Sequence, residues 1–162
     1  MRKYLALCFN ALFLLAVISC NPNRILDKNE KIPDGVWDRA KKLSFTVNIP
    51  DTSAAYDIYI NVRNAGVYQF SNLFLFINTT LPDGRIARDT AECTLSDAKG
   101  EWLGDGLGDI WDNSILFKKN MHFPLKGNYT FELEQAMRTP LLPGIMDAGI
   151  RIEKISADGE KR

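Results

Sequence analysis

The sequence has 162 residues, a length that predicts one domain with room for a sizeable core. Its 20 Lys and Arg residues balance 20 Asp and Glu residues, so the formal net charge is zero. Because nucleic-acid-binding proteins normally carry a basic excess, this balance argues against a nucleic-acid partner. With 46% hydrophobic and 25% charged residues, the composition also differs from that of a disordered chain.

The first 20 residues have the features of a bacterial export signal. A short basic segment precedes an apolar stretch over residues 4–18, which is short for a membrane-spanning helix. Val17-Ile18-Ser19-Cys20 then resembles a lipobox, which predicts cleavage after residue 19. The predicted anchor is a diacylglycerol on the Cys20 sulfur, with an acyl chain such as palmitate on the new N-terminus. An ordinary secretory peptide, in which Cys20 has no role, is the alternative.

Removal of residues 1–19 as a signal peptide changes these totals. The mature chain keeps 143 of the 162 residues, with 18 basic and 20 acidic ones and a side-chain charge of −2. Cys93 is then the only free thiol, which excludes an intramolecular disulfide and a zinc or redox site built on paired cysteines. Residues 20–36 are polar and contain Pro and Gly, which predicts a lipidated tether before a domain over residues 37–162.

The residues that follow Cys20 bear on the location of the protein. Asn21-Pro22-Asn23-Arg24 contains no acidic cluster of the kind that directs some lipoproteins to the cell surface. We therefore expect a lipid-anchored cell-envelope protein on a periplasm-facing leaflet, of either the inner or the outer membrane. Two or more acyl chains would make this membrane attachment effectively permanent.

From residue 37 onward the apolar residues recur at every second position, which is typical of half-buried strands. Residues 72–80 are apolar on both faces, which indicates a central strand. No long helical period occurs in this part of the chain. The pattern predicts an antiparallel β-sandwich of about seven or eight strands, with a closed β-barrel as the alternative. The expected strands cover residues 43–49, 56–62, 72–80, 88–95, 114–118, 129–133 and 147–155.

Residues 100–112 form the densest unusual stretch, with four of the eleven glycines. Its candidate partner-binding residues are Trp102, Asp105, Asp109, Trp111 and Asp112. In one reading the three aspartates ligate calcium, although their spacing does not match the twelve-residue calcium loop. In a second reading paired carboxylates act on a glycoside while the tryptophans stack on sugar rings. The favoured reading is a tight glycine-containing loop that the tryptophans pack onto the sandwich.

Other residues offer little catalytic chemistry. His122 is the sole histidine and lies between apolar neighbours, and Cys93 lies within an expected strand, where a buried thiol is the default. No serine lies in a GxSxG motif. Glu134 and Arg138 form a second candidate surface, for which a solvated strand face is the simpler alternative. The sequence therefore predicts a non-enzymatic protein with no metal and no cofactor other than its covalent lipid.

Several of these segments together resemble the gliding-motility lipoprotein H family, GldH. The matching segments are the lipobox ending at Cys20 and residues 68–77, 89–90, 102–112, 123–131, 134–138, 142–145 and 149–154. The resemblance implies an envelope lipoprotein needed for gliding over surfaces and linked to the associated protein secretion machinery. It brings no catalytic residue and no cofactor with it.

Two functional hypotheses follow. In the favoured one the protein is held in the membrane by its lipid and binds other envelope lipoproteins or components of the secretion or motility machinery. In the alternative it is a carbohydrate-binding β-sandwich lipoprotein, with or without calcium. The alternative requires Trp102 and Trp111 to be exposed and coplanar, at a spacing that fits successive sugar rings.

Overall fold

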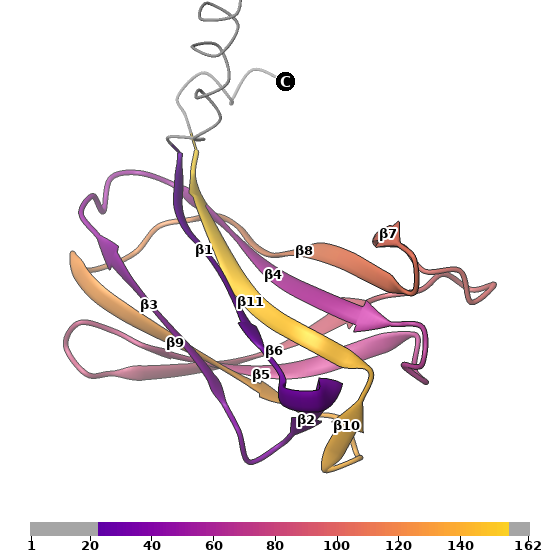
Figure 1. Cartoon of the computed structure of the whole chain (residues 1–162). Helices are drawn as coiled ribbons and strands as arrows, with labels where there is room; N and C mark the ends of the chain where they lie inside the picture. The colour runs from indigo at the N-terminus through magenta and orange to yellow at the C-terminus, as the bar shows by residue number, and fades with distance from the viewer. Residues whose placement is uncertain (1–22, 156–162) are drawn as a thin grey trace, which may run out of the picture.

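The computed structural model describes residues 23–155, and the leader with the lipidation candidate Cys20 lies outside this range. Within it the chain forms eleven strands and one short 3₁₀ turn (Figure 1). They are β1 (Arg24–Lys31), η2 (Pro33–Gly35), β2 (Val36–Asp38), β3 (Leu43–Ile49), β4 (Tyr56–Ala65), β5 (Asn72–Thr80), β6 (Ile86–Thr94), β7 (Asp105–Leu107), β8 (Ile110–Met121), β9 (Gly127–Gln135), β10 (Leu141–Pro143) and β11 (Ile145–Lys154).

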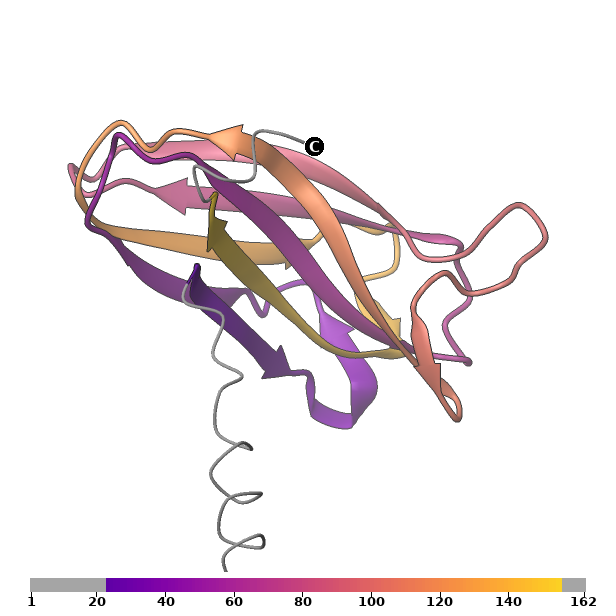
Figure 2. The same cartoon turned by 90° about the horizontal axis from the view of Figure 1, so that it is seen from above.

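Two sheets pack face to face, as Figures 1 and 2 show. The first sheet has five strands in the order β1-β11-β4-β8-β7, and the second has four in the order β3-β9-β5-β6. A two-stranded sheet of β2 and β10 lies beside them. All neighbouring strands are antiparallel, and none of the sheets among the described residues closes into a barrel. The predicted antiparallel β-sandwich is therefore confirmed.

The core lies between the inner faces of the two large sheets. In β3 and β4 the residues at every second position are buried, because alternate side chains of a strand point to opposite faces. The first sheet contributes buried aliphatic residues such as Ile58 and Ile150, and the second contributes Leu75, Phe131 and Leu133. The alternation that predicted these strands is thus the pattern of a sheet with one buried face.

β5 is an interior strand of the second sheet, between β9 and β6. Its inward residues, among them Leu75, are fully buried, whereas Phe74 on the other face is 36% exposed. Phe76 is half-buried, with the Arg88 guanidinium 4.2 Å from its ring centre. The central position of this strand is confirmed, but its apolar outer face does not pack against another layer.

The predicted tether over residues 20–36 is wrong for the part that the structure describes. Residues 24–31 form β1, which pairs with β11 along its whole length, from Arg24 to Lys31. Trp37 in β2 is 1% exposed, and its indole donates a hydrogen bond to the carbonyl oxygen of Lys41. The β-sandwich therefore begins at residue 24 and not at 37.

The sandwich has two ends, which we name by their distance from Arg24. The near end holds the start of β1 and the loops 50–55 and 122–126, because Arg24 pairs with Glu153 and β4 starts opposite the last residue of β8. The far end holds the loops 66–71 and 95–104 and the turn that joins β7 to β8. Figures 1 and 2 both show β7 at the opposite end of the molecule from the start of β1.

Candidate functional site

Three aromatic rings from separate parts of the chain meet at the far end. Trp102 and Trp111 have ring centres 5.5 Å apart with planes 36° from parallel, and Tyr68 lies 6.4 Å from Trp102. Phe70 contacts Tyr68 edge to face at 5.6 Å. We call these four residues the aromatic cluster. The tryptophans pack against each other and against the loop 66–71, so the geometry favours the reading in which they hold the glycine-rich loop on the sandwich.

The glycines of this loop make the packing sterically feasible. A side chain at Gly106 would place a carbon 2.8 Å from the Trp111 indole nitrogen. At Gly104 the corresponding distance to the carbonyl oxygen of Asp112 is 2.7 Å. Since real Cβ contacts are not this short, both positions require a residue without a side chain. Close packing against Trp111 and Asp112 thus accounts for two of the four glycines, whereas Gly100 and Gly108 have open space and a positive φ.

Three apolar side chains at the far end remain in contact with solvent. Val67 is 72% exposed, Leu103 58% and Phe70 38%. The loops that carry them lie against each other, since the Leu95 and Ser96 amides both donate to the carbonyl oxygen of Ser71. Exposed apolar residues grouped on one part of a surface are typical of protein-interaction sites.

The three aspartates of the glycine-rich loop lie on β7, on β8 and in the turn between these strands. Asp105 and Asp112 are cross-strand neighbours of β7 and β8, while Asp109 lies in the turn between the two strands. All three are exposed, and no group of three or more His, Cys, Asp or Glu within residues 23–155 is arranged to hold a metal ion.

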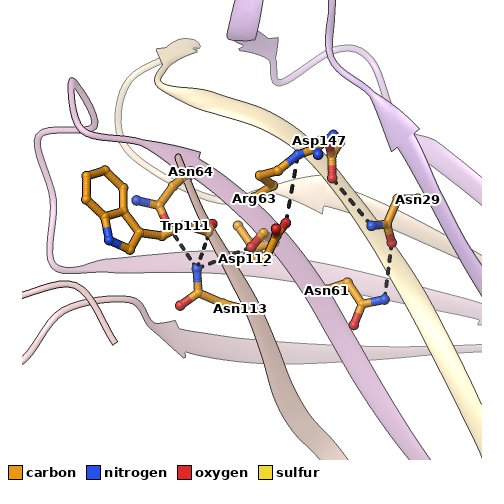
Figure 3. Close-up of polar contacts among 9 residues, drawn as sticks. Asn29, Asn61, Arg63, Asn64, Trp111, Asp112, Asn113 and Asp147 are labelled. Carbon is orange, nitrogen blue, oxygen red and sulfur yellow. Dashed lines mark hydrogen bonds and ion pairs between the residues drawn. The ribbon is translucent and has the colours of Figure 1, made fainter. Parts of the chain in front are cut away.

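A buried asparagine fixes the position of Trp111. The Asn113 amide nitrogen lies 2.9 Å from Asn64 Oδ1, 3.2 Å from the Val62 carbonyl oxygen and 3.3 Å from the Trp111 carbonyl oxygen (Figure 3). Asn64 is fully buried and Asn113 is 8% exposed. Because buried amides are costly to leave unpaired, these contacts hold β8 in register against β4 and set the backbone at the cluster.

The outer face of the first sheet carries a polar network that the sequence did not reveal. Asn61 donates to Asp27 Oδ1 at 3.2 Å and to Asn29 Oδ1 at 3.1 Å, and accepts from the Ser114 hydroxyl at 3.0 Å. Figure 3 shows Asn29 and Asn61 beside an ion pair between Arg63 and Asp147. Asp27, Asn29, Asn61 and Ser114 line a pocket of about 290 Å³ together with Arg151 and Asp112.

Asp147 is the most deeply buried carboxylate of this face, at 1% exposure. Arg63 pairs with it through Nε at 2.6 Å and also through its terminal nitrogen, and lies 3.9 Å from Asp112. These residues come from β1, β4, β8 and β11, which are far apart in the sequence. In the sequence, the one indication of this arrangement is that polar residues alternate with apolar ones along β4, which places Asn61 and Arg63 on the same outer face.

The second predicted surface lies elsewhere. Glu134 is on the outer face of β9 and pairs with Arg88 at 3.6 Å, while Arg138 is exposed beyond the end of that strand. The structure does not bring Glu134 together with the aromatic cluster, because the strand of Glu134 belongs to the second sheet and that of Trp111 to the first.

Cys93 and His122 have contrasting environments. Cys93 is fully buried, and burial raises the pKa of its thiol to about 12. His122 is exposed and follows the end of β8 at the near end. The two residues lie on different elements, and neither belongs to the aromatic cluster.

The fold and this site define an antiparallel β-sandwich with an aromatic, glycine-rich loop at one end. The model of the GldH lipoprotein family matches residues 24–152, almost the whole described range. The chain belongs to the GldH lipoprotein family. It is therefore a lipid-anchored protein of the cell envelope, and no helix in the described part of the chain has the length and apolarity needed to cross a membrane.

Two relatives support this assignment. The gliding motility lipoprotein GldH homolog of Christiangramia forsetii is 35% identical over 153 residues, covering 88% of this chain and 93% of the relative. The gliding motility lipoprotein GldH of Flavobacterium johnsoniae is 30% identical over 155 residues, covering 90% and 96%. A chain from the structure of infectious bursal disease virus Gx strain aligns with a TM-score of 0.32 and 12% identity. That alignment covers 80% of this chain and 29% of the viral chain, and a TM-score this low does not indicate a shared fold.

Proposed function

We propose that the protein is a non-enzymatic, lipid-anchored component of the gliding motility machinery, of the associated protein secretion machinery, or of both. In this proposal Cys20 carries the lipid, the protein faces the periplasm, and the domain acts through contacts with other envelope proteins. The relatives named as gliding motility lipoproteins cover nearly the whole chain and support the process.

The observation that carries the contact proposal is the far end of the sandwich. Val67 and Leu103 expose apolar surface next in sequence to Tyr68 and Trp102 of the aromatic cluster, and Phe70 of the cluster is itself 38% exposed. The segment over residues 95–112, which includes Leu103, carries five carboxylates against one lysine, Lys99. We infer that the partner presents an apolar group with basic residues at its border, since such a surface complements both features.

Crosslinking in intact cells tests this proposal. A photo-crosslinking amino acid at position 103 is expected to capture an envelope protein that mass spectrometry then identifies. The same residue at position 86 serves as the control, because Ile86 is 69% exposed and begins β6 at the near end. Specific capture from position 103 alone supports the proposal, whereas identical capture from both positions contradicts it.

Substitutions at the same surface give a second readout. Leu103→Asp combined with Val67→Asp is expected to abolish co-purification of the captured protein and to leave the melting temperature nearly unchanged, because both side chains are exposed. Ile86→Asp is the matched control. Trp102→Ala and Trp111→Ala are less informative, since both rings pack within the fold.

The carbohydrate-binding alternative finds less support. The two tryptophan rings lie against each other at 36°, so they do not offer two coplanar faces to successive sugar rings. A glycan array that shows binding abolished by Trp102→Ala, together with a calcium-dependent rise in melting temperature, would restore this alternative.

A further inference from the structure

We propose that the near end of the sandwich stands on the headgroups of the membrane that holds the lipid anchor, so that the far end points away from that membrane. This inference rests on the lipidation of Cys20 in the proposed function. It adds a second interaction surface, with a lipid surface as its partner, and it follows from where β1 begins and from how charge is distributed on the fold.

The connection between lipid and domain is short. Only Asn21, Pro22 and Asn23 separate Cys20 from the first residue of β1. Asn23 is already tied to the fold, because its carbonyl oxygen accepts a hydrogen bond from the Lys154 amide at 2.7 Å. The three steps from Cys20 to Asn23 span at most about 11 Å even when fully extended. The near end therefore cannot move far from the lipid headgroups.

The length of the sandwich separates its two ends by more than this connection can span. β4 has ten residues and runs between the ends, which corresponds to about 33 Å at the usual rise of a strand. With the start of β1 held within about 11 Å of the anchor, the domain either stands on its near end or lies on one side. The distribution of charge distinguishes these two arrangements.

Charge favours the standing arrangement. Lys119 and Lys126 are exposed at the near end, and neither takes part in an ion pair among residues 23–155. The pocket on the outer face of the first sheet is instead lined by three carboxylates, those of Asp27, Asp105 and Asp112, against one cation, Arg151. Anionic headgroups attract the lysines and repel this face. The domain is thus expected to rest on its lysine-bearing end and to hold the loop 95–104 away from the lipid.

Fluorescence quenching in vesicles tests this orientation. The lipidated full-length protein, with His122→Cys or with Leu103→Cys, is labelled with a thiol-reactive fluorophore; His122 is exposed at the near end, and its replacement keeps both lysines. It is then inserted into vesicles of phosphatidylethanolamine and phosphatidylglycerol that carry a nitroxide on the headgroup. Cys93 does not interfere, because it is fully buried and burial raises the pKa of its thiol. We expect about threefold stronger quenching at position 122 than at position 103, since the ends of the strands lie about 30 Å apart.

A longer connection provides the matched control. Ten Gly and Ser residues inserted between Asn21 and Pro22 add a flexible segment of about 18 Å on average. In this variant the difference in quenching between the two positions is expected to shrink, because the domain can then tumble above the surface.

The outcomes separate this inference from the proposed function. Equal quenching at positions 122 and 103 in the protein of native length, or stronger quenching at 103, overturns the orientation and leaves the proposed lipid anchor unaffected. A mass spectrum that shows no lipid on Cys20 contradicts the proposed lipid anchor, and the proposed orientation then fails with it. Stronger quenching at position 122 that depends on the native connection length supports the orientation, whatever partner binds the far end.

Discussion

Gly149 shows how one missing side chain determines the packing of an edge strand. It lies in β11 directly opposite Asn29 of β1. A Cβ atom at Gly149 would lie 2.1 Å from the Lys28 carbonyl oxygen and 2.2 Å from Asn29 Oδ1. Both distances are far inside van der Waals contact, so only glycine allows β1 to approach β11 and to complete the polar network of the outer face.

Gly149→Ala is therefore expected to lower the free energy of unfolding by about 3 kcal/mol, the upper range for an overpacked site. Gly100→Ala is the control, because Gly100 has φ of +84° and open space around it. That variant adds only the backbone strain of a positive φ, about 1 kcal/mol. Chemical denaturation measures both values. Equal losses in the two variants would show that β1 moves away from β11 at little cost and would contradict the tight packing at Gly149.

Cys93 offers a second test at the scale of a single residue. Its thiol is fully buried, and burial raises its pKa to about 12, so almost no thiolate exists at pH 8. We expect a thiol-reactive disulfide reagent to leave the folded protein unmodified at that pH and to modify Cys93 within minutes in guanidinium. Fast modification without denaturant would mean that the second sheet opens locally at β6.

At the scale of the strands, β1 is the element that the sequence pattern did not predict. Only Leu26 of its eight residues is buried, at 7% exposure, while five of the seven others are charged. An edge strand covers the core on one side and meets solvent on the other, so it needs few apolar residues. This composition is also that of a tether, which explains why the sequence indicated one.

Leu26→Ala distinguishes a strand from a tether. Truncation of a buried leucine is expected to reduce the free energy of unfolding by about 2 to 3 kcal/mol. Lys28→Ala, two residues further along the same strand and exposed, is expected to change it by less than about 0.5 kcal/mol. Thermal or chemical denaturation checks both. An unchanged free energy of unfolding in both variants would contradict the pairing of β1 with β11.

The Asp51–Lys154 pair closes the near end between the loop after β3 and the end of β11. Hydrogen bonds from Ser53 and Lys154 hold the pKa of the Asp51 carboxyl well below its usual range. The hydrogen bond and the charge of Asp51 raise the pKa of Lys154. Because the pKa of Asp51 is lowered in the fold, its ionised carboxyl stabilises the protein above the ordinary Asp pKa, and this stabilisation is lost as the pH falls. Because the pKa of Lys154 is raised, its charged amine stabilises the protein below the ordinary Lys pKa, and this stabilisation is lost as the pH rises above that value.

This pair is therefore expected to add no pH dependence to stability between about pH 5 and 9, since both groups stay charged there. Asp51→Asn should shift the pKa of Lys154 downward, toward the ordinary lysine value. Nuclear magnetic resonance titration of the Lys154 side chain measures this shift. A lysine titration that is identical in both proteins would show that the contact does not persist in solution.

At the scale of the whole molecule, charge is distributed unevenly along the sandwich. Exposed lysines lie at the near end, whereas the segment over residues 95–112 at the far end carries an excess of carboxylates. A domain with this distribution tends to orient in front of an anionic surface even without a covalent anchor.

The mature chain without lipid is thus expected to bind phosphatidylglycerol vesicles weakly. Lys119→Glu with Lys126→Glu should reduce this affinity by roughly 30-fold, on the basis of about 1 kcal/mol for each lysine removed. Lys41→Glu with Lys99→Glu makes the same change in net charge elsewhere and should have a much smaller effect. Vesicle sedimentation in low and high salt measures this, and the difference should vanish in high salt. Equal losses in the two double variants would indicate that only net charge matters.

The amino-acid sequence by itself determined the class of fold and much of the core. Alternation over residues 43–49 and 56–62 reports directly that each strand has one buried face, so these strands were predictable. Glycines interleaved with two tryptophans predicted a loop packed by aromatic rings, and the contact between Trp102 and Trp111 agrees with this. Both signals are local, because they depend on residues close together in the chain.

Only the tertiary structure decided which residues meet across strands. β1 shows no alternation, and its place in the sheet depends on pairing with β11 at the other end of the chain. The contacts of Arg63 with Asp147 and of Asn61 with Asp27 depend on the register of three strands. The physical reason is that register arises from packing of the whole sandwich, and a shift of one residue would turn each of these side chains toward the core.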